Sequence, residues 1–410
     1  MGPEEPSNAQ EAPSWLTKDY FEGVLRDNLE DPGVTVESFD VRTTTVKGDN
    51  YASVIHRVAV TCRSGDSRRE KHFIVKSLPA KGLARRYIEE MRLFDNEISA
   101  YAVLFPAMRD LCGTGVVSPS FYATGREGTV ILEDLAPRGF KMADRKKRLD
   151  LVHCFEALKA LARFHGLSHA VAQRDPAIAD LFSVPEKSRW MKEMEDSFFP
   201  KVYSLLASIV EMWPGYERFS EKLISCSDVI IKKVNAGLKP NEEAFNVLIH
   251  GDFWVNNMLF RYDEETKNLI EVCLIDLQMV KYASPAIDLH YFLSSSLADG
   301  IRDEHEDRLL ECYHQTLVDT LESVGLNAGV YSIDDLKKDY ADKAHVGFHL
   351  GVMVLGAVAA EPSEAFEFDN VTAESLQDGS TNPLEKTFRA KGYRPVLEKH
   401  LLYYEKMGVL

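Results

Sequence analysis

Apolar residues in the first third of the chain follow a strand-like pattern. Four segments are rich in β-branched residues and are bounded by Gly, Asp or Ser, which is typical of short strands. These segments are VESFDVRTTTV (36–46), SVIHRVAVTC (53–62), KHFIVKSL (71–78) and GTVILEDL (128–135). Between the third and fourth segments, residues 88–105 place apolar side chains at helical spacing. The pattern therefore predicts a small sheet with one helix.

The pattern changes after residue 136, where helical spacing dominates. Residues 149–170, 186–237 and the chain from 288 onward have apolar residues at helical intervals. Short strands interrupt the helices around LIHGDFWVNNMLF and LIEVCLIDLQMV, and the polar, acidic residues 362–382 predict a loop. With a join at LAPRG, we expect a disordered tail over 1–15, an N-terminal lobe over 16–135 and a C-terminal lobe over 136–410. This is an α+β organisation.

Size, composition and charge narrow the possible partners. With 410 residues the chain exceeds one core of ordinary size, which agrees with two lobes. The apolar fraction of 45% and the aromatic fraction of 10% are those of a folded globular protein. The net charge of −16 argues against nucleic acid or an anionic membrane as the main partner, because both bind basic surfaces.

Targeting signals and cysteine usage suggest a compartment. No run of about 18 apolar residues occurs, so no membrane span is predicted. The N-terminal segment MGPEEPSNAQEAPS lacks an apolar core and is not expected to be a signal peptide. The six cysteines are scattered and lack CxxC spacing, which is typical of reduced thiols. We therefore expect a cytoplasmic protein.

The segment LIHGDFWVNNMLF (248–260) places polar residues between two apolar runs. Asp252 and Asn257 share the turn after the first run, and Asp276 ends a later apolar run, VCLI. Two strand ends can place Asn257 and Asp276 side by side, and such hard oxygen ligands suit Mg²⁺ together with substrate phosphates. Asp252 would then accept or orient a hydroxyl proton, as phosphoryl transfer from ATP requires. In the structural alternative, Asp252 and Asn257 only form the turn and Asp276 caps an element.

A lysine and a glutamate further upstream lie where charge is costly. Lys76 is inside the apolar strand FIVKSL, where its ammonium needs a partner or an anion. Glu97 shares the apolar face of the predicted helix with Phe94 and Tyr101. An ion pair between Lys76 and Glu97 would satisfy both charges and aim the ammonium at the α- and β-phosphates. Alternatively, Lys76 extends into solvent from an edge strand and Glu97 is unrelated to it.

Two other polar groupings have simpler interpretations. His165 and His169 are one helical turn apart, but no third ligand is evident and HExxH is absent. Packing or hydrogen bonding is therefore favoured over zinc. The basic stretch KMADRKKR (141–148) is interpreted as a solvated helix start rather than a phosphate- or membrane-binding surface.

Together, Lys76, Glu97, HGDFWVNN and IDLQ resemble the protein-kinase-like phosphotransferases, in their aminoglycoside and choline kinase branch. Within that branch the chain is similar to the ecdysteroid-kinase-like family, through HGDFWVNNMLF, IDLQMVKYASPAIDL, ILEDL, LARFHGLSHA and FDNEISAY. The resemblance spans residues 35–405 and is most specific over 249–290. It implies a two-lobed protein-kinase-like fold, with a small antiparallel sheet and one helix in the N-terminal lobe and a larger helical C-terminal lobe.

The resemblance implies a role for each residue of the charged set. Asp252 is then the catalytic aspartate, and Asn257 and Asp276 are the Mg²⁺ ligands. Lys76 contacts the ATP phosphates, and Glu97 anchors Lys76.

The resemblance also implies how the nucleotide is held. Backbone groups from Glu133 to Leu135 would bind adenine. Ser53, or backbone amides of the turn KGDNYAS (47–53), would bind phosphate. His250 would support the catalytic loop by hydrogen bonding, and Asp288 would order the C-terminal lobe.

Departures from the protein-kinase pattern bear on the acceptor. Trp254 stands two residues after Asp252, where Ser/Thr kinases have Lys, Asp276 precedes Leu-Gln rather than Phe-Gly, and no A-P-E segment is visible. The implied acceptor is therefore a small-molecule alcohol, an ecdysteroid or another lipophilic hydroxyl compound. Choline or ethanolamine is the alternative acceptor. A non-catalytic small-ligand-binding protein on a kinase fold and a protein kinase are the remaining hypotheses.

Overall fold

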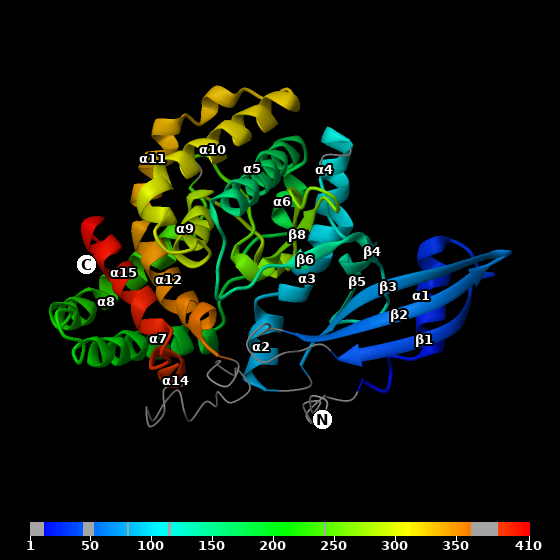
Figure 1. The fold of residues 1–410 in the computed structure, drawn as a ribbon, viewed down its shortest axis with the longest axis horizontal. Coiled ribbons are helices and arrows are strands. Elements are labelled where there is room, and N and C mark those ends of the chain that lie inside the picture. Colours follow the sequence, from blue (N-terminus) through cyan, green and yellow to red (C-terminus); the bar gives the residue numbers. More distant parts are fainter. Residues whose placement is uncertain (1–11, 44–52, 80–81, 114–115, 242, 362–383) are drawn as a thin grey trace.

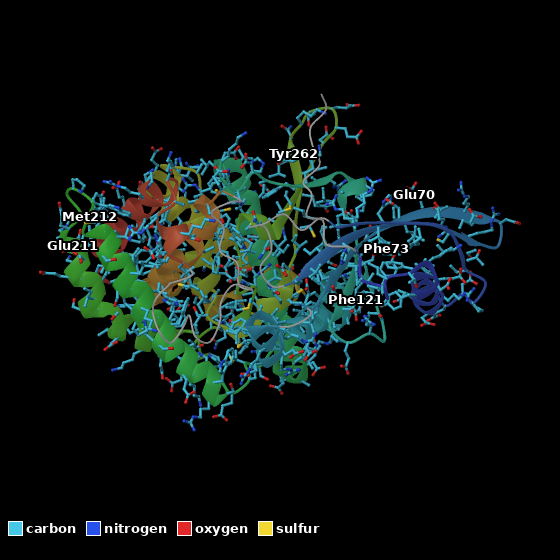
Figure 2. All side chains as sticks on the ribbon, turned by 90° about the horizontal axis from the view of Figure 1, so that it is seen from below. Glu70, Phe73, Phe121, Glu211, Met212 and Tyr262 are labelled. Carbon is cyan, nitrogen blue, oxygen red and sulfur yellow. The ribbon has the colours of Figure 1, made fainter. Side chains whose placement is uncertain are left out.

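The structure is a computed structural model that describes residues 12–43, 53–79, 82–113, 116–241, 243–361 and 384–410. A sheet-rich part and a helical part lie at opposite ends of the longest axis (Figure 1). Figure 2 marks these ends: Glu70, Phe73 and Phe121 belong to the sheet, and Glu211 and Met212 follow helix α7 (Arg189–Val210). Most of the expected N-terminal tail and the predicted loop over 362–382 lie outside the described residues.

An antiparallel five-stranded sheet is built from the first third of the chain, in the order β1-β2-β3-β5-β4. Its strands are β1 (Thr35–Thr43), β2 (Val54–Ser64), β3 (Ser67–Ser77), β4 (Phe121–Tyr122) and β5 (Thr129–Glu133). A two-residue turn joins β2 to β3, with Gly65 at a φ of 57° that glycine adopts without strain. The predicted small antiparallel sheet is confirmed, and β4 is an addition to it.

Alternation along the strands gives this sheet two different faces. Val58 and Phe73 face α1 (Lys18–Leu29), a helix that the sequence pattern did not predict, and pack on its buried Phe21. Residues of the opposite face, such as Val130, pack with Phe94 in the largest hydrophobic cluster. Lys76 alternates with the α1-facing residues and therefore lies on this second face, toward the helical part.

The predicted helix over 88–105 is divided into several segments. These are α2 (Leu83–Glu90), α3 (Leu93–Ser99), the π-helical turn η1 (Ala100–Leu104) and α4 (Phe105–Cys112). Arg92, with a left-handed φ of 54°, separates α2 from α3. The break separates α2 from α3, and α3 packs against β5 of the sheet.

Helices make up most of the chain after residue 136. They are α5 (Leu151–Arg174), α6 (Pro176–Asp180), α7, α8 (Arg218–Gly237), α9 (Ala286–Ser295), α10 (Ile301–Ser323), α11 (Ile333–Asp342), α12 (Ala344–Ala359), α14 (Glu385–Phe388) and α15 (Tyr393–Lys406). Short strands form a three-stranded sheet and a two-stranded sheet. The strands are β6 (Phe140–Met142), β8 (Met258–Tyr262) and β9 (Leu269–Leu274) in one, and β7 (Val247–Ile249) and β10 (Lys281–Ala283) in the other.

One hydrophobic cluster connects the two parts of the molecule. It contains Phe94 and Leu132 from the sheet-rich part and Leu158, Phe253 and Phe292 from the helical part. Buried apolar area stabilises by roughly 25 cal/mol per Å². The segment that carries Asp252 is therefore anchored on the main core.

The interpretation of 141–148 as a solvated helix start is wrong. Asp150 caps α5 by accepting a hydrogen bond from the His153 N–H at 3.0 Å, so the helix begins only at Leu151. Arg145 is buried and donates to the carbonyls of Ala357, Val358 and Ala360. These carbonyls end α12, where a cation satisfies groups that have no partner within the helix.

Two expectations about the chain as a whole can be compared with the structure. All six cysteines are described, and each is a free thiol. Among the described helices, none combines the length and apolarity needed to cross a membrane.

Candidate active site

The turn that carries Asp252 begins where β7 ends and leads into the short helix η3 (Val255–Asn257) and then β8. Gly251 has a φ of 78°, which disfavours other residues. A Cβ atom on Gly251 would also lie 2.3 Å from the Met279 carbonyl oxygen of η4 (Leu277–Met279). The glycine thus lets the Asp252 turn pack directly against the segment that follows Asp276.

Asp288, in the first turn of α9, holds the backbone of the Asp252 turn. Its carboxylate accepts from the His250 N–H at 2.6 Å and from the Gly251 N–H at 2.9 Å. His165 Nε2 is 3.0 Å from the same carboxylate, and His165 Nδ1 is 2.7 Å from the Tyr313 hydroxyl. Burial alone would raise the pKa of Asp288, but these donors lower it overall. His165 is therefore hydrogen-bonded, and His169, 2.8 Å from the Asn246 carbonyl, belongs to a separate contact.

Asp252 is held by two side chains. The Asn257 amide donates to Asp252 Oδ2 and to its backbone carbonyl, both at 2.8 Å. The Tyr291 hydroxyl donates to Oδ1 at 2.6 Å. Burial raises the pKa of Asp252, and the nearby Asp276 charge adds to this, while Tyr291 and Asn257 oppose it.

Sequence reasoning did not identify Tyr291. It lies three residues after Asp288 on α9, so both side chains reach the same loop from one helical face. That spacing was visible in the sequence and was the available signal.

Asn257 and Asp276 are brought together by the β8–β9 pairing. Met258 lies opposite Leu274, and the Ile275 N–H donates to the Asn257 carbonyl at 3.1 Å. Because the Asn257 nitrogen is committed to Asp252, its side-chain oxygen is the atom available to a cation. Asp276 has a left-handed φ of 64°, and its side chain does not cap η4.

Lys76 forms ion pairs with two carboxylates, those of Glu97 and Asp276. Its ammonium lies 2.6 Å from Glu97 Oε1 and 2.8 Å from Asp276 Oδ1. β3 lies between β2 and β5, so Lys76 does not extend from an edge strand. Glu97 on α3 is only 2% exposed.

The protonation of this cluster follows from burial and from charge. Burial by itself lowers the pKa of Lys76, but the carboxylates of Asp276 and Glu97 outweigh it and raise the pKa. Burial raises the pKa of Glu97 to about 7, because Lys76 only partly offsets the lost hydration and Asp276 adds repulsion. Two carboxylates therefore share one ammonium, which leaves an excess of negative charge.

The donor set fits Mg²⁺. Within the described ranges, no group of three or more His, Cys, Asp or Glu side chains could hold a metal ion by itself. Mg²⁺ needs only one or two protein ligands, because waters and phosphate oxygens complete its shell. The Asn257 oxygen and the Asp276 carboxylate supply that number.

The other predicted nucleotide contacts lie at the start of β2 and after β5. The Glu133 carboxylate accepts from the Ser120 N–H and hydroxyl at 3.1 and 3.0 Å, so only its backbone is a candidate for adenine. Leu135 is buried, and its carbonyl accepts from the N–H groups of Arg138 and Phe140. Ser53 directly precedes β2, and the rest of the predicted phosphate turn lies outside the described residues.

A cavity of about 840 Å³ is separate from the charged cluster. Ser77, Val54 and His56 line it. Adjacent strand residues point to opposite faces, so Ser77 lies on the face opposite to Lys76. The structure therefore brings Lys76, Glu97, Asp252, Asn257 and Asp276 together, and this cavity is not part of their site.

Comparison with known proteins agrees with this geometry. Residues 47–326 match the profile of the ecdysteroid kinase-like family. A 65-residue stretch is 32% identical to 4-hydroxytryptamine kinase of Psilocybe cyanescens and covers 16% of this chain and 17% of that protein. The fold is similar to choline kinase from Cryptosporidium parvum Iowa II, with a TM-score of 0.50 and 12% identity over 96% of this chain and 98% of that one.

The structural likeness confirms the predicted protein-kinase-like fold, with its antiparallel sheet and mostly helical remainder. The profile match extends over more than half of the chain and includes the segments of Lys76, Glu97, Asp252, Asn257 and Asp276. The chain therefore belongs to the ecdysteroid kinase-like family.

Proposed function

We propose that the protein is an ATP- and Mg²⁺-dependent kinase that phosphorylates a hydroxyl group of a small-molecule alcohol. The observation that carries this proposal is the convergence of the charged set from separate elements. Lys76 comes from β3, Glu97 from α3, Asp252 from the turn after β7, Asn257 from η3 and Asp276 from the turn after β9.

Asn257 and Asp276 are the proposed Mg²⁺ ligands. When bound there, Mg²⁺ would neutralise charge on the phosphate oxygens and orient them. Lys76 stays protonated between its two carboxylates and would donate to the phosphates. Glu97 accepts a hydrogen bond from the Lys76 ammonium through Oε1 and would thereby keep the ammonium oriented toward the proposed phosphate site.

Asp252 would receive the acceptor hydroxyl. In the proposed transfer, a bond forms between the acceptor oxygen and the γ-phosphorus, and the bond from that phosphorus to ADP breaks. The hydroxyl proton passes to Asp252, whose raised pKa favours taking it up. Asn257 and Tyr291 fix the orientation of the carboxylate.

The proposal also assigns the groups that bind the adenine base and cover the phosphates. Backbone groups from Glu133 to Leu135 would hold adenine, with Ser53 and its neighbours over the phosphates. The proposed lobes are residues 16–135 and 136–410, and Glu133 to Leu135 end the first of them. A cytoplasmic location also remains a proposal.

Family membership favours an ecdysteroid or another lipophilic alcohol as the acceptor. The alternative, choline or ethanolamine, requires a site for a cation, and choline is commonly held by aromatic rings. Three tyrosines, Tyr340, Tyr403 and Tyr404, surround a cation in this structure, but that cation is Arg302. This cage is therefore already filled by the chain itself.

The test is Mg·ATP consumption with a panel of ecdysteroids, choline, ethanolamine and phenols, with products identified by mass. A gain of one phosphoryl group on one class supports the proposal and names the acceptor. Mg·ATP should also raise the melting temperature, because a ligand of the native state stabilises it. Absence of both effects would favour a non-catalytic protein, and phosphorylation of peptides would favour a protein kinase.

A further inference from the structure

A lysine next to the Asp252 turn, Lys281, lacks a hydrogen-bond or ion-pair partner among the described residues. Lys281 begins β10 and pairs in register with Ile249, the last residue of β7 before the Asp252 turn. Its side chain is partly buried, and no hydrogen bond or ion pair reaches its ammonium from the described part of the chain. An ammonium withdrawn from water without a partner costs free energy.

The strand register places the stem of Lys281 among apolar groups. Lys281 and Ala283 share one face of the β7–β10 pair with Val247 and Ile249. Ala283, Val247 and Ile249 belong to a small hydrophobic cluster that includes Val346 of α12. The ammonium therefore lies at the edge of an apolar surface, at the strand end nearest to Asp252.

The charges around Lys281 do not neutralise it. Lys187, whose charge acts on Lys281, already forms an ion pair with Glu195 of α7 at 2.6 Å. Asp288 attracts the Lys281 ammonium, but its oxygens accept from His250, Gly251 and His165. Burial lowers the pKa of Lys281 to about 8, and Lys187 adds to the shift.

Contacts of α2 with α7 and its N-cap hold the segment of the Lys187–Glu195 pair against α2. The Arg86 guanidinium of α2 lies 4.2 Å from the ring centre of Trp190 on α7, and the Ser188 hydroxyl donates to Glu90. Tyr87 follows Arg86 in α2. Burial raises the pKa of its hydroxyl, and the negative charges of Glu195 and Asp252 raise that pKa further. Glu195 and Asp252 therefore both lie near Tyr87.

We infer that Lys281 binds an oxygen atom of the acceptor, a carbonyl or a carboxylate oxygen, and thereby selects uncharged or anionic alcohols over cationic ones. This inference rests on the proposed function, because the acceptor hydroxyl must reach Asp252. Lys281 would be a specificity-determining residue: its ammonium donates to the acceptor oxygen, and it repels an ammonium group of choline or ethanolamine. The apolar surface beside its stem suits a lipophilic alcohol.

The experiment measures kcat and KM of the full chain for three alcohols that differ in charge. The probes are an ecdysteroid with a ketone, cholate with a carboxylate, and choline. The variants are Lys281→Met and Lys281→Glu, and Lys147→Met is the matched control because Lys147 is highly exposed. Melting temperatures confirm that each variant is folded.

Lys281→Met should raise KM for the ecdysteroid or cholate about tenfold, the effect of losing one hydrogen bond to a charged group, with kcat nearly unchanged. Lys281→Glu should raise that KM further and lower the KM for choline. A larger effect on cholate than on the ecdysteroid identifies a carboxylate as the oxygen, and the reverse identifies a carbonyl. The control should behave as wild type.

Equal effects on all three probes, or wild-type preference for choline, would overturn the inference. If no probe is phosphorylated, calorimetric binding replaces turnover, and identical affinities in wild type, Lys281→Met and Lys281→Glu overturn it as well. Mg·ATP binding distinguishes failure of the inference about Lys281 from failure of the proposed kinase function. If Mg·ATP binds but substitution of Lys281 does not change the preference among acceptors, only the inference fails. If Mg·ATP does not raise the melting temperature of the wild type, the proposed function fails.

Discussion

The cationic side chains of Arg302 and Lys76 are both largely withdrawn from solvent, and their surroundings differ. The Arg302 guanidinium donates to Glu306 at 3.0 Å and to the Tyr340 hydroxyl at 2.9 Å, and it lies 3.4 Å from the ring centre of Tyr403. Arg302 is therefore paired with one carboxylate, that of Glu306, and the rings of Tyr403 and Tyr404 lie against its guanidinium. At Lys76, one cation faces the carboxylates of both Glu97 and Asp276.

The difference separates a charge with a structural role, Arg302, from the charge of the proposed active site, Lys76. At Arg302 the chain supplies a balanced set of partners, so the group stabilises the packing of α10, α11 and α15. At Lys76 the carboxylates are in excess, and an additional cation would relieve their repulsion. An unbalanced cluster of this kind is expected where a metal ion and phosphates bind.

The largest expected effect is on catalysis. Asp276→Asn should lower kcat/KM by about a thousandfold or more, as loss of one preorganised electrostatic group does in other enzymes. The variant should stay folded, because an amide still reaches Lys76. Steady-state kinetics and thermal melting measure the two effects, and full activity in the variant would contradict the assigned metal ligand.

Arg302→Met should lower stability and leave activity nearly unchanged, the reverse of the Asp276→Asn effect. Removing the guanidinium leaves Glu306 without its cation and should cost about 3 kcal/mol of unfolding free energy. Activity per folded molecule should stay near wild type. Urea unfolding and active-site-normalised turnover test this, with Glu306→Leu in the Arg302→Met background expected to recover part of the stability.

Asp288 extends the comparison to a buried carboxylate that supports the Asp252 turn. Its hydrogen-bond donors among the described residues are the N–H groups of His250 and Gly251 and the His165 ring. Asp288→Asn should cost about 2 kcal/mol at neutral pH, since a buried amide cannot accept from all three donors. The folded-state pKa of Asp288 is lowered, so its stabilisation is present above the usual value of 3.8 and is lost as pH falls through the folded-state pKa. Unfolding curves should therefore converge for variant and wild type in strong acid. A difference independent of pH would mean that the carboxylate charge contributes nothing.

The smallest expected effect belongs to Tyr291. Tyr291→Phe removes one hydrogen bond to Asp252 and should lower kcat about tenfold, with little change in KM for ATP. Tyr313→Phe is a useful control, because it removes a hydroxyl from the same network at His165, away from Asp252. If both variants lose the same activity, Tyr291 acts through general packing rather than by positioning Asp252.

The strands, the apolar helix faces, the four charged site residues and Asn257 could be predicted from local patterns. Alternation and helical spacing depend on neighbours in sequence, so β1, β2, β3, β5 and α5 lie close to their predicted positions. Glu97 was recognisable because an acid on an apolar helix face is costly. α1 was not predicted, and the partners of Tyr291, Lys281 and Arg302 depend on elements far away in the chain.

The sequence by itself determined the family resemblance, the sheet followed by helices, and which residues are proposed to carry the chemistry. Only the tertiary structure decided that Lys76 contacts Glu97 and Asp276 at once, the latter 200 positions away. It also decided that Asp288 holds the turn of Asp252 and that no described residue forms a hydrogen bond or ion pair with the Lys281 ammonium. The physical reason is that local patterns fix which face of a strand or helix is buried. The packing of distant elements then determines which charges meet.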